Sequence, residues 1–83
     1  MRDCIALNAA EQIFIGTKGG GVLRSTDNGD SWTPMNNGLT STDVWALAVA
    51  PNGSVFAGTL GGGVFRSTDN GDSWTQVNNG LDM

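Results

Sequence analysis

Short stretches of apolar and β-branched residues alternate along the chain with turns that are rich in glycine and asparagine. Asn-Gly between two such stretches is a strong hairpin signal, because both residues tolerate a positive φ. No segment has the run of about ten residues with helical periodicity that a helix needs. The chain is therefore predicted to be all-β. The predicted strands are residues 4–9, 12–17, 21–26, 31–35, 44–50, 54–59, 63–68 and 73–77.

Residues 44–50 form the most apolar of these predicted strands. Because side chains alternate across a strand, we expect Trp45, Leu47 and Val49 on one side and smaller residues on the other. Both sides are apolar, so both should be covered by other parts of the protein. The fourth predicted strand is more polar and contains Pro34, whose missing N–H suits an edge strand.

The chain contains an internal repeat of 42 residues. Residues 16–41 match residues 58–83 at 20 of 26 positions, whereas residues 1–15 match residues 43–57 at only two. Each unit contains four of the predicted strands, which is the content of one β-propeller blade. We therefore predict two four-stranded antiparallel propeller blades. The two predicted blades are residues 1–42 and 43–83.

The sequence RSTDNGDSW occurs twice, between the third and fourth predicted strands of each unit. In the first copy, the Asp27 carboxylate can accept hydrogen bonds from backbone N–H groups of its own turn. Gly29 can supply a positive φ, and Trp32 can pack back across the sheet. We therefore expect the motif to stabilise the turn. The residues predicted to have this structural role are Ser25, Asp27, Gly29, Trp32, Ser67, Asp69, Gly71 and Trp74.

These residues fit the pattern Ser-x-Asp-x-Gly-x-x-Trp at residues 25–32 and 67–74. The pattern resembles the Asp-box of the bacterial neuraminidase repeat. The surrounding sequence, GVFRSTDNGDSWTQVNNGL, is similar to blades of sialidase-type, sortilin-type and photosystem II assembly-factor propellers. The resemblance covers nearly the whole chain, and it implies that both units are propeller blades.

Residue types that support metal binding or nucleophilic catalysis are scarce. The chain has no histidine, which removes Ser-His-Asp and Cys-His systems and the common zinc sites. Cys4 is the single cysteine, so it is expected to be a small buried residue, with an intersubunit disulfide as the alternative. Asp27, Asn28 and Asp30 lie close together, but they lack the alternating ligands and distal glutamate of a calcium loop. We therefore predict no cofactor and no metal.

The sequence also argues against an enzyme. Sialidases, which the repeat resembles, rely on a tyrosine nucleophile, three arginines and acidic partners. This chain has no tyrosine. Arg24 and Arg66 occupy equivalent positions of the repeat, so a ring of blades would hold them apart. We therefore expect no catalytic activity and no catalytic residues.

Charge and hydropathy argue against two classes of partner. The formal net charge is −4 with only four lysines and arginines, which argues against nucleic acid and against an anionic membrane surface. The longest unbroken apolar run, residues 44–50, is far too short to span a bilayer. The N-terminal residues do not have the basic and then apolar form of a signal peptide.

Two blades alone would expose two apolar faces to water, and such faces promote association. We therefore expect a non-catalytic scaffold that closes a β-propeller by binding copies of itself head to tail. A homotrimer with six blades is favoured, and a homotetramer with eight blades is the next alternative. The sequence leaves open whether the chain is a natural protein, a fragment of a longer array or an engineered model of a repeat protein.

The alternative function is an oligomeric lectin that binds carbohydrate, or a protein, on the loop face of the ring. Trp45 would be an aromatic platform, and polar side chains of the loops would contact sugar hydroxyls. Packing between blades is the favoured role of Trp45, and the Asn-Asn-Gly runs also suit turns. The candidate ligand-binding residues are Trp45, Asn37, Asp43, Asn79 and Lys18.

Overall fold

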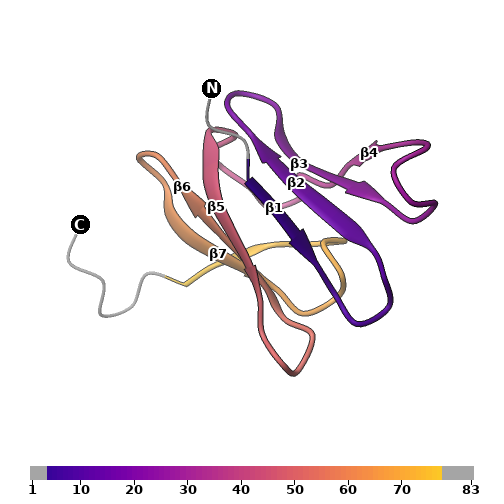
Figure 1. The fold of residues 1–83 in the computed structure, drawn as a ribbon. Helices are drawn as coiled ribbons and strands as arrows, with labels where there is room; N and C mark the ends of the chain where they lie inside the picture. The colour runs from indigo at the N-terminus through magenta and orange to yellow at the C-terminus, as the bar shows by residue number, and fades with distance from the viewer. Residues whose placement is uncertain (1–3, 78–83) are drawn as a thin grey trace.

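The computed structural model describes residues 4–77 and places them in two antiparallel sheets of four strands each, with no helix in that range (Figure 1). The all-β prediction and all eight predicted strands are confirmed, although each strand is shorter than expected, and the fourth and eighth strands have two residues each where five were expected. The strands are β1 (Cys4–Leu7), β2 (Ile13–Thr17), β3 (Gly21–Ser25), β4 (Thr33–Pro34), β5 (Val44–Val49), β6 (Val55–Thr59), β7 (Gly63–Ser67) and β8 (Thr75–Gln76). Between residues 4 and 77 there is no helix that could pass through a membrane.

Each sheet is a meander in which consecutive strands pair, in the orders β1-β2-β3-β4 and β5-β6-β7-β8. The registers of the two sheets are equivalent: Phe14 pairs with Arg24 in the first sheet, and Phe56 pairs with Arg66 in the second. The last strands, β4 and β8, have two residues each and lie at sheet edges. The edge position predicted for Pro34 is thus confirmed.

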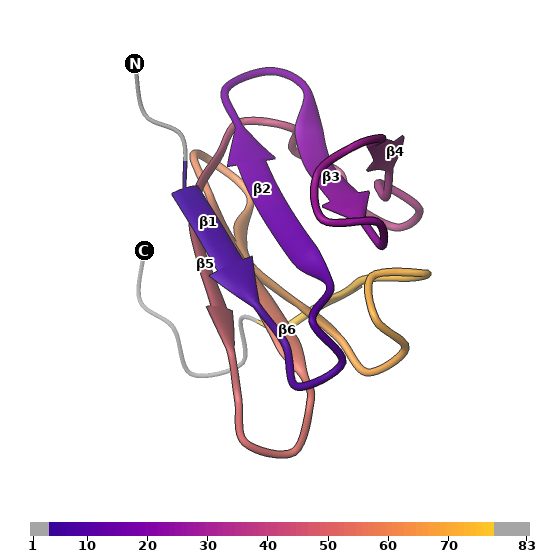
Figure 2. The same cartoon turned by 45° about the vertical axis from the view of Figure 1, so that its right-hand side comes forward.

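The two sheets pack against each other, with β1 and β2 lying on β5 (Figure 1, Figure 2). The first sheet contributes Phe14 and Val22 to the shared core, and the second contributes Val55, Ala57 and Phe65. All five side chains have an exposed fraction of 0 or 1%. Alternating side chains point to opposite faces of a sheet. Each sheet therefore buries one face in this core and turns its other face away from it.

A β-bulge between Val44 and Ala46 interrupts the alternation along β5. Val44 is fully buried in the core, with Leu47 and Val49 packed against that core, whereas Trp45 is 52% exposed. The expectation that Trp45 shares a side with Leu47 and Val49 is therefore wrong. A bulge sets two residues opposite one on the neighbouring strand, which here turns Val44 toward the core and Trp45 toward solvent.

Gly16 of β2 lies directly against β1 and β5. A Cβ atom added at Gly16 would lie 2.6 Å from Cys4 Sγ and 2.6 Å from Val44 Cγ1. The repeat equivalent, Gly58, has more room, because a Cβ atom there would lie 3.4 Å from Ala46 Cβ. The packing between the sheets therefore requires glycine at position 16 and not at position 58.

We expect the substitution Gly16→Ala to destabilise the fold by about 1–3 kcal/mol, because the added methyl group forces the packed sheets apart. Gly58→Ala adds the same methyl group on the face that is turned away from the core. Its expected effect on the free energy of unfolding is less than about 0.5 kcal/mol. Urea denaturation of single chains, at a protein concentration too low for copies to associate, compares the two variants, and equal stabilities there would contradict the packing of β2 on β5.

Candidate functional site

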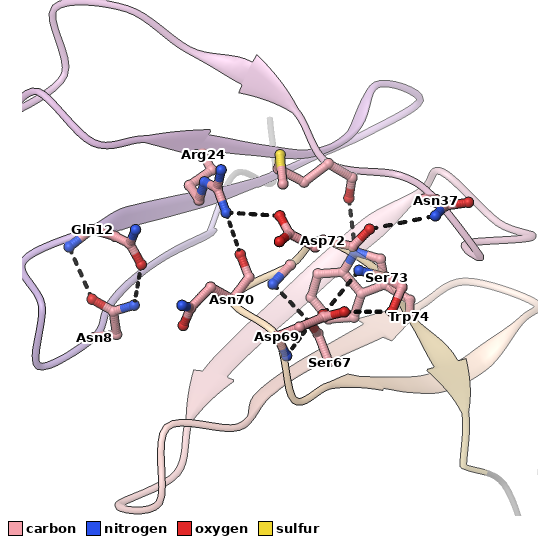
Figure 3. Close-up of polar contacts among 12 residues, drawn as sticks. Asn8, Gln12, Arg24, Asn37, Ser67, Asp69, Asn70, Asp72, Ser73 and Trp74 are labelled. Atoms are coloured by element: carbon pink, nitrogen blue, oxygen red, sulfur yellow. Dashed lines mark hydrogen bonds and ion pairs between the residues drawn. The ribbon is translucent and has the colours of Figure 1, made fainter.

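The turn between β7 and β8 is organised around the carboxylate of Asp69 (Figure 3). The Ser67 hydroxyl donates to Asp69 Oδ1 at 2.7 Å, and the Gly71 N–H donates to Ser67 Oγ at 2.8 Å. Ser73 donates its backbone N–H to Asp69 Oδ1 at 2.9 Å and its hydroxyl to Oδ2 at 2.7 Å. These four hydrogen bonds close the turn. We refer to residues 67–74 as the second Asp turn.

The equivalent segment, residues 25–32, is the first Asp turn and has the same geometry around Asp27. The hydroxyls of Ser25 and Ser31 donate to the two carboxylate oxygens at 2.8 and 2.6 Å, and the Ser31 N–H donates at 2.9 Å. Asn28 and Gly29 have φ angles of 64° and 91°. The carboxylate acceptor and the positive φ expected from the sequence are therefore both present in this turn.

These hydrogen bonds lower the pKa of both aspartates from the ordinary 3.8 to about 2. The Ser31 hydroxyl has the largest effect on the pKa of Asp27, and the Ser73 hydroxyl has the largest effect on that of Asp69. Both aspartates are exposed, so hydrogen bonding and not burial accounts for the low pKa. The sequence motif did not single out Ser31 and Ser73, although each follows its aspartate by four residues.

Residues 4–77 contain no group of three acidic, cysteine or histidine side chains that could hold a metal ion. The oxygens of Asp27 and Asp69 accept hydrogen bonds from hydroxyl and amide groups of their own turns. In this structure the two aspartates therefore act on the shape of their turns.

Trp74 of the second Asp turn reaches from its own sheet to the first sheet (Figure 3). Its indole Nε1–H donates to the Met35 carbonyl at 2.7 Å, and its backbone N–H donates to the Asn37 carbonyl at 2.9 Å. The Trp74 side chain is 5% exposed, whereas the equivalent Trp32 is only partly buried. The structure thus differs from the expectation that this tryptophan packs across its own sheet: Trp74 joins the two sheets.

Arg24 of β3 reaches in the opposite direction, from the first sheet to the second Asp turn (Figure 3). Its Nη1 donates to the Asn70 carbonyl at 2.7 Å and lies 3.3 Å from Asp72 Oδ1. Phe14, the ladder partner of Arg24, lies beside Gly71: a Cβ atom added at Gly71 would be 3.2 Å from Phe14 Cε2. The first sheet therefore contacts the second Asp turn through the Arg24 guanidinium and the Phe14 ring.

At equivalent positions of the repeat, a residue that is buried in one sheet is partly exposed in the other. Phe14 is fully buried whereas Phe56 is partly exposed, and Ala57 is fully buried whereas Ile15 is partly exposed. Buried positions alternate along both β2 and β6, but they are out of phase by one residue in the aligned repeat. The face that the first sheet turns inward is therefore the face that the second sheet turns outward.

Two sheet faces thus remain open. The first open face consists of Ile5, Leu7, Ile13, Ile15 and Leu23, on β1, β2 and β3. The second open face consists of Ala46, Ala48, Phe56, Val64 and Arg66, on β5, β6 and β7. Ile5 and Leu7 are each 61% exposed. Apart from Arg66, all of the residues named for these two faces are apolar, which makes the faces the candidate functional site.

The structure brings together only some of the residues predicted to bind a ligand. Lys18 and Asp43 are paired in a β-bridge, and Trp45 lies close to Asp43 along the chain, at the start of β5. Asn37 instead donates to a backbone carbonyl of the second Asp turn at 3.5 Å. Asn79 lies outside the described residues. Residues 4–77 form no pocket, and carbohydrate binding stays a prediction.

In comparisons with known proteins, no family model, no curated protein and no solved structure matches this chain. The basis for a function is therefore the chemistry of its own open faces and Asp turns.

The low pKa values predict how stability depends on pH. A carboxyl group whose pKa is lower in the folded than in the unfolded chain stabilises the fold fully above the unfolded value of 3.8. This contribution is lost as the pH falls through 3.8 toward the folded value of about 2. We therefore expect the free energy of unfolding to decrease across this window, as measured by urea denaturation from neutral pH to pH 2.

The double variant Asp27→Asn/Asp69→Asn should be less stable at neutral pH and should show a smaller decrease across the same window. Glu11→Gln is the matched control, because Glu11 is exposed and lies outside both Asp turns. A decrease that is equally large in the double variant and in the control would show that other carboxyl groups cause it.

Proposed function

We propose that the chain is a non-catalytic module that assembles with copies of itself and so closes a β-propeller. In this assembly the first open face of one copy packs on the second open face of the next. The observation that carries the proposal is that equivalent residues of the repeat are buried in one sheet and partly exposed in the other. Phe14 and Ala57 are covered by a contact inside the chain, and their equivalents Phe56 and Ile15 lie on the two faces that this contact leaves open.

The apolar residues of the open faces supply the driving force for association. Burying an isoleucine or leucine side chain that is otherwise in water stabilises a protein by about 1.5–3 kcal/mol. Ile5 and Leu7, each 61% exposed, lie on the first open face with three further aliphatic residues. Monomeric proteins rarely expose apolar patches that are contiguous over several strands. A second copy of the chain removes both patches from water, because each copy carries one face of each kind.

The arrangement of the faces favours a ring. A contact between two unlike faces is heterologous. Repeating such a contact closes a ring when the rotation from one copy to the next is a whole fraction of 360°. Three copies would bring together six sheets and four copies would bring together eight, within the range of about four to eight blades in propellers. We propose the three-copy ring, with the four-copy ring as the alternative. The resemblance of both Asp turns to the Asp-box supports this architecture.

The mass of the native protein tests the proposal. Light scattering is expected to give three or four times the 8.6 kDa of one chain. The substitution Ile5→Glu places a charge within the first open face, where the proposed contact would bury it without a partner. We expect this variant to remain folded, by circular dichroism, and to have the mass of a single chain.

Leu60→Glu is the matched control for Ile5→Glu. Leu60 is 60% exposed, close to the 61% of Ile5, but it lies in the turn between β6 and β7, outside both open faces. This variant should keep the mass of the unmodified protein. A folded, unmodified chain that stays at 8.6 kDa at every concentration would refute the proposed function.

A further inference from the structure

Among the contacts that join the two sheets within one chain, three have a repeat equivalent that is not formed. These three contacts are Arg24 with Asn70 and Asp72, Trp74 with Met35, and Phe14 with Gly71. A shift of 42 residues gives the equivalents, which are Arg66 with Asn28 and Asp30, Trp32 with Val77, and Phe56 with Gly29. In every equivalent pair, one member belongs to the first sheet and the other belongs to the second.

The members of these pairs lie at the two open faces. Arg66 and Phe56 are part of the second open face, and the first Asp turn borders the first open face at the end of β3. Arg66 and Asp30 are both exposed, and neither side chain has a hydrogen-bond or ion-pair partner among the described residues. The indole N–H of Trp32 likewise makes no hydrogen bond within residues 4–77.

We propose that Arg66 of one copy binds the first Asp turn of the next copy. Its guanidinium donates to the Asn28 carbonyl and pairs with the Asp30 carboxylate. In return, the Trp32 indole N–H of that next copy donates to the Val77 carbonyl of the first. The partner is therefore a second copy of this chain, and the inference rests on the proposed function because it specifies the contacts at each junction.

Both halves of this junction are already formed in the single chain. The two Asp turns share the sequence STDNGDSW and the same hydrogen bonds. Their asparagines have nearly the same backbone angle, with φ of 64° at Asn28 and 61° at Asn70. Arg66 has the same position in its ladder as Arg24, opposite a phenylalanine. The first Asp turn therefore presents to a neighbour the same carbonyl and carboxylate that the second presents to Arg24.

The junction also sets the direction of assembly. Two second open faces packed on each other would leave both Arg66 side chains without an Asp turn to bind. Two first open faces would leave the Asp30 carboxylate and the Trp32 indole N–H without the groups that complement them. Contact between unlike faces supplies an acceptor for every donor, so association proceeds head to tail and not as a twofold dimer.

The apolar faces and the polar junction have different roles. An exposed ion pair contributes little affinity by itself, whereas complementary charge selects the register and the partner face. The apolar residues of the open faces therefore supply the affinity, and Arg66 and Asp30 select the orientation in which the faces meet.

Reversal of one charge at a time tests the junction. We expect Asp30→Lys and Arg66→Glu each to weaken association by about fivefold or more at each junction, measured by sedimentation equilibrium on the full chain. Each reversal removes an exposed ion pair worth up to about fivefold and adds repulsion between two like charges. The double variant Asp30→Lys/Arg66→Glu restores opposite charges and is expected to recover the affinity to within about twofold. A mixture of the two single variants should also associate more tightly than either variant alone.

Glu11→Lys is the matched control, because it makes the same change of charge as Asp30→Lys at an exposed residue of the β1–β2 turn. It should associate like the unmodified protein. Circular dichroism confirms that each variant is folded. If the unmodified chain assembles but the single variants associate equally tightly, or the double variant stays as weak as the single ones, the junction is wrong and the proposed function stands. If the unmodified chain does not assemble, both fail.

Discussion

The contact between the two sheets is the interaction on which the rest of the structure depends. It is reciprocal, because Trp74 reaches from the second sheet to the Met35 carbonyl of the first, and Arg24 reaches from the first sheet to the second Asp turn. Between these polar contacts lie fully buried side chains such as Phe14 and Val55. A sheet that is apolar on both faces needs another sheet on each face. In one chain of two sheets, each sheet has only one such neighbour, so one face of each sheet stays uncovered. The open faces follow from this constraint.

Local hydrogen bonding prepares this tertiary contact. The carboxylate of Asp69 accepts hydrogen bonds from Ser67 and Ser73, and these bonds fix the turn in a shape that includes a positive φ at Asn70. That shape presents the Asn70 carbonyl to Arg24. The exposed aspartate therefore stabilises the core indirectly, through the backbone of its turn. Because the first Asp turn has the same internal bonds without a neighbouring sheet, the turn does not depend on the contact for its geometry.

The sequence predicted the features that depend on neighbouring residues. The strands follow from alternating apolar residues, and the turns follow from glycine, asparagine and the acceptor of Asp27. Features that depend on the second sheet were not predictable in this way. The bulge at Val44 places Val44, and not Trp45, on the same side of β5 as Leu47, and the direction of Trp74 is set by the Met35 carbonyl of the other sheet. Two identical copies of a motif have one sequence, and only the packing shows that one copy is covered and the other is not.

The short outer strands limit where another chain could extend the sheets. A long, regular strand at a sheet edge offers unpaired N–H and C=O groups that another chain can extend into a cross-β ladder. Here β4 and β8 present two residues each, and Pro34 of β4 has no N–H to donate. A further strand therefore finds few hydrogen-bonding groups at these two edges, and the longer strands at the opposite edges, β1 and β5, are where a sheet of this chain could be extended.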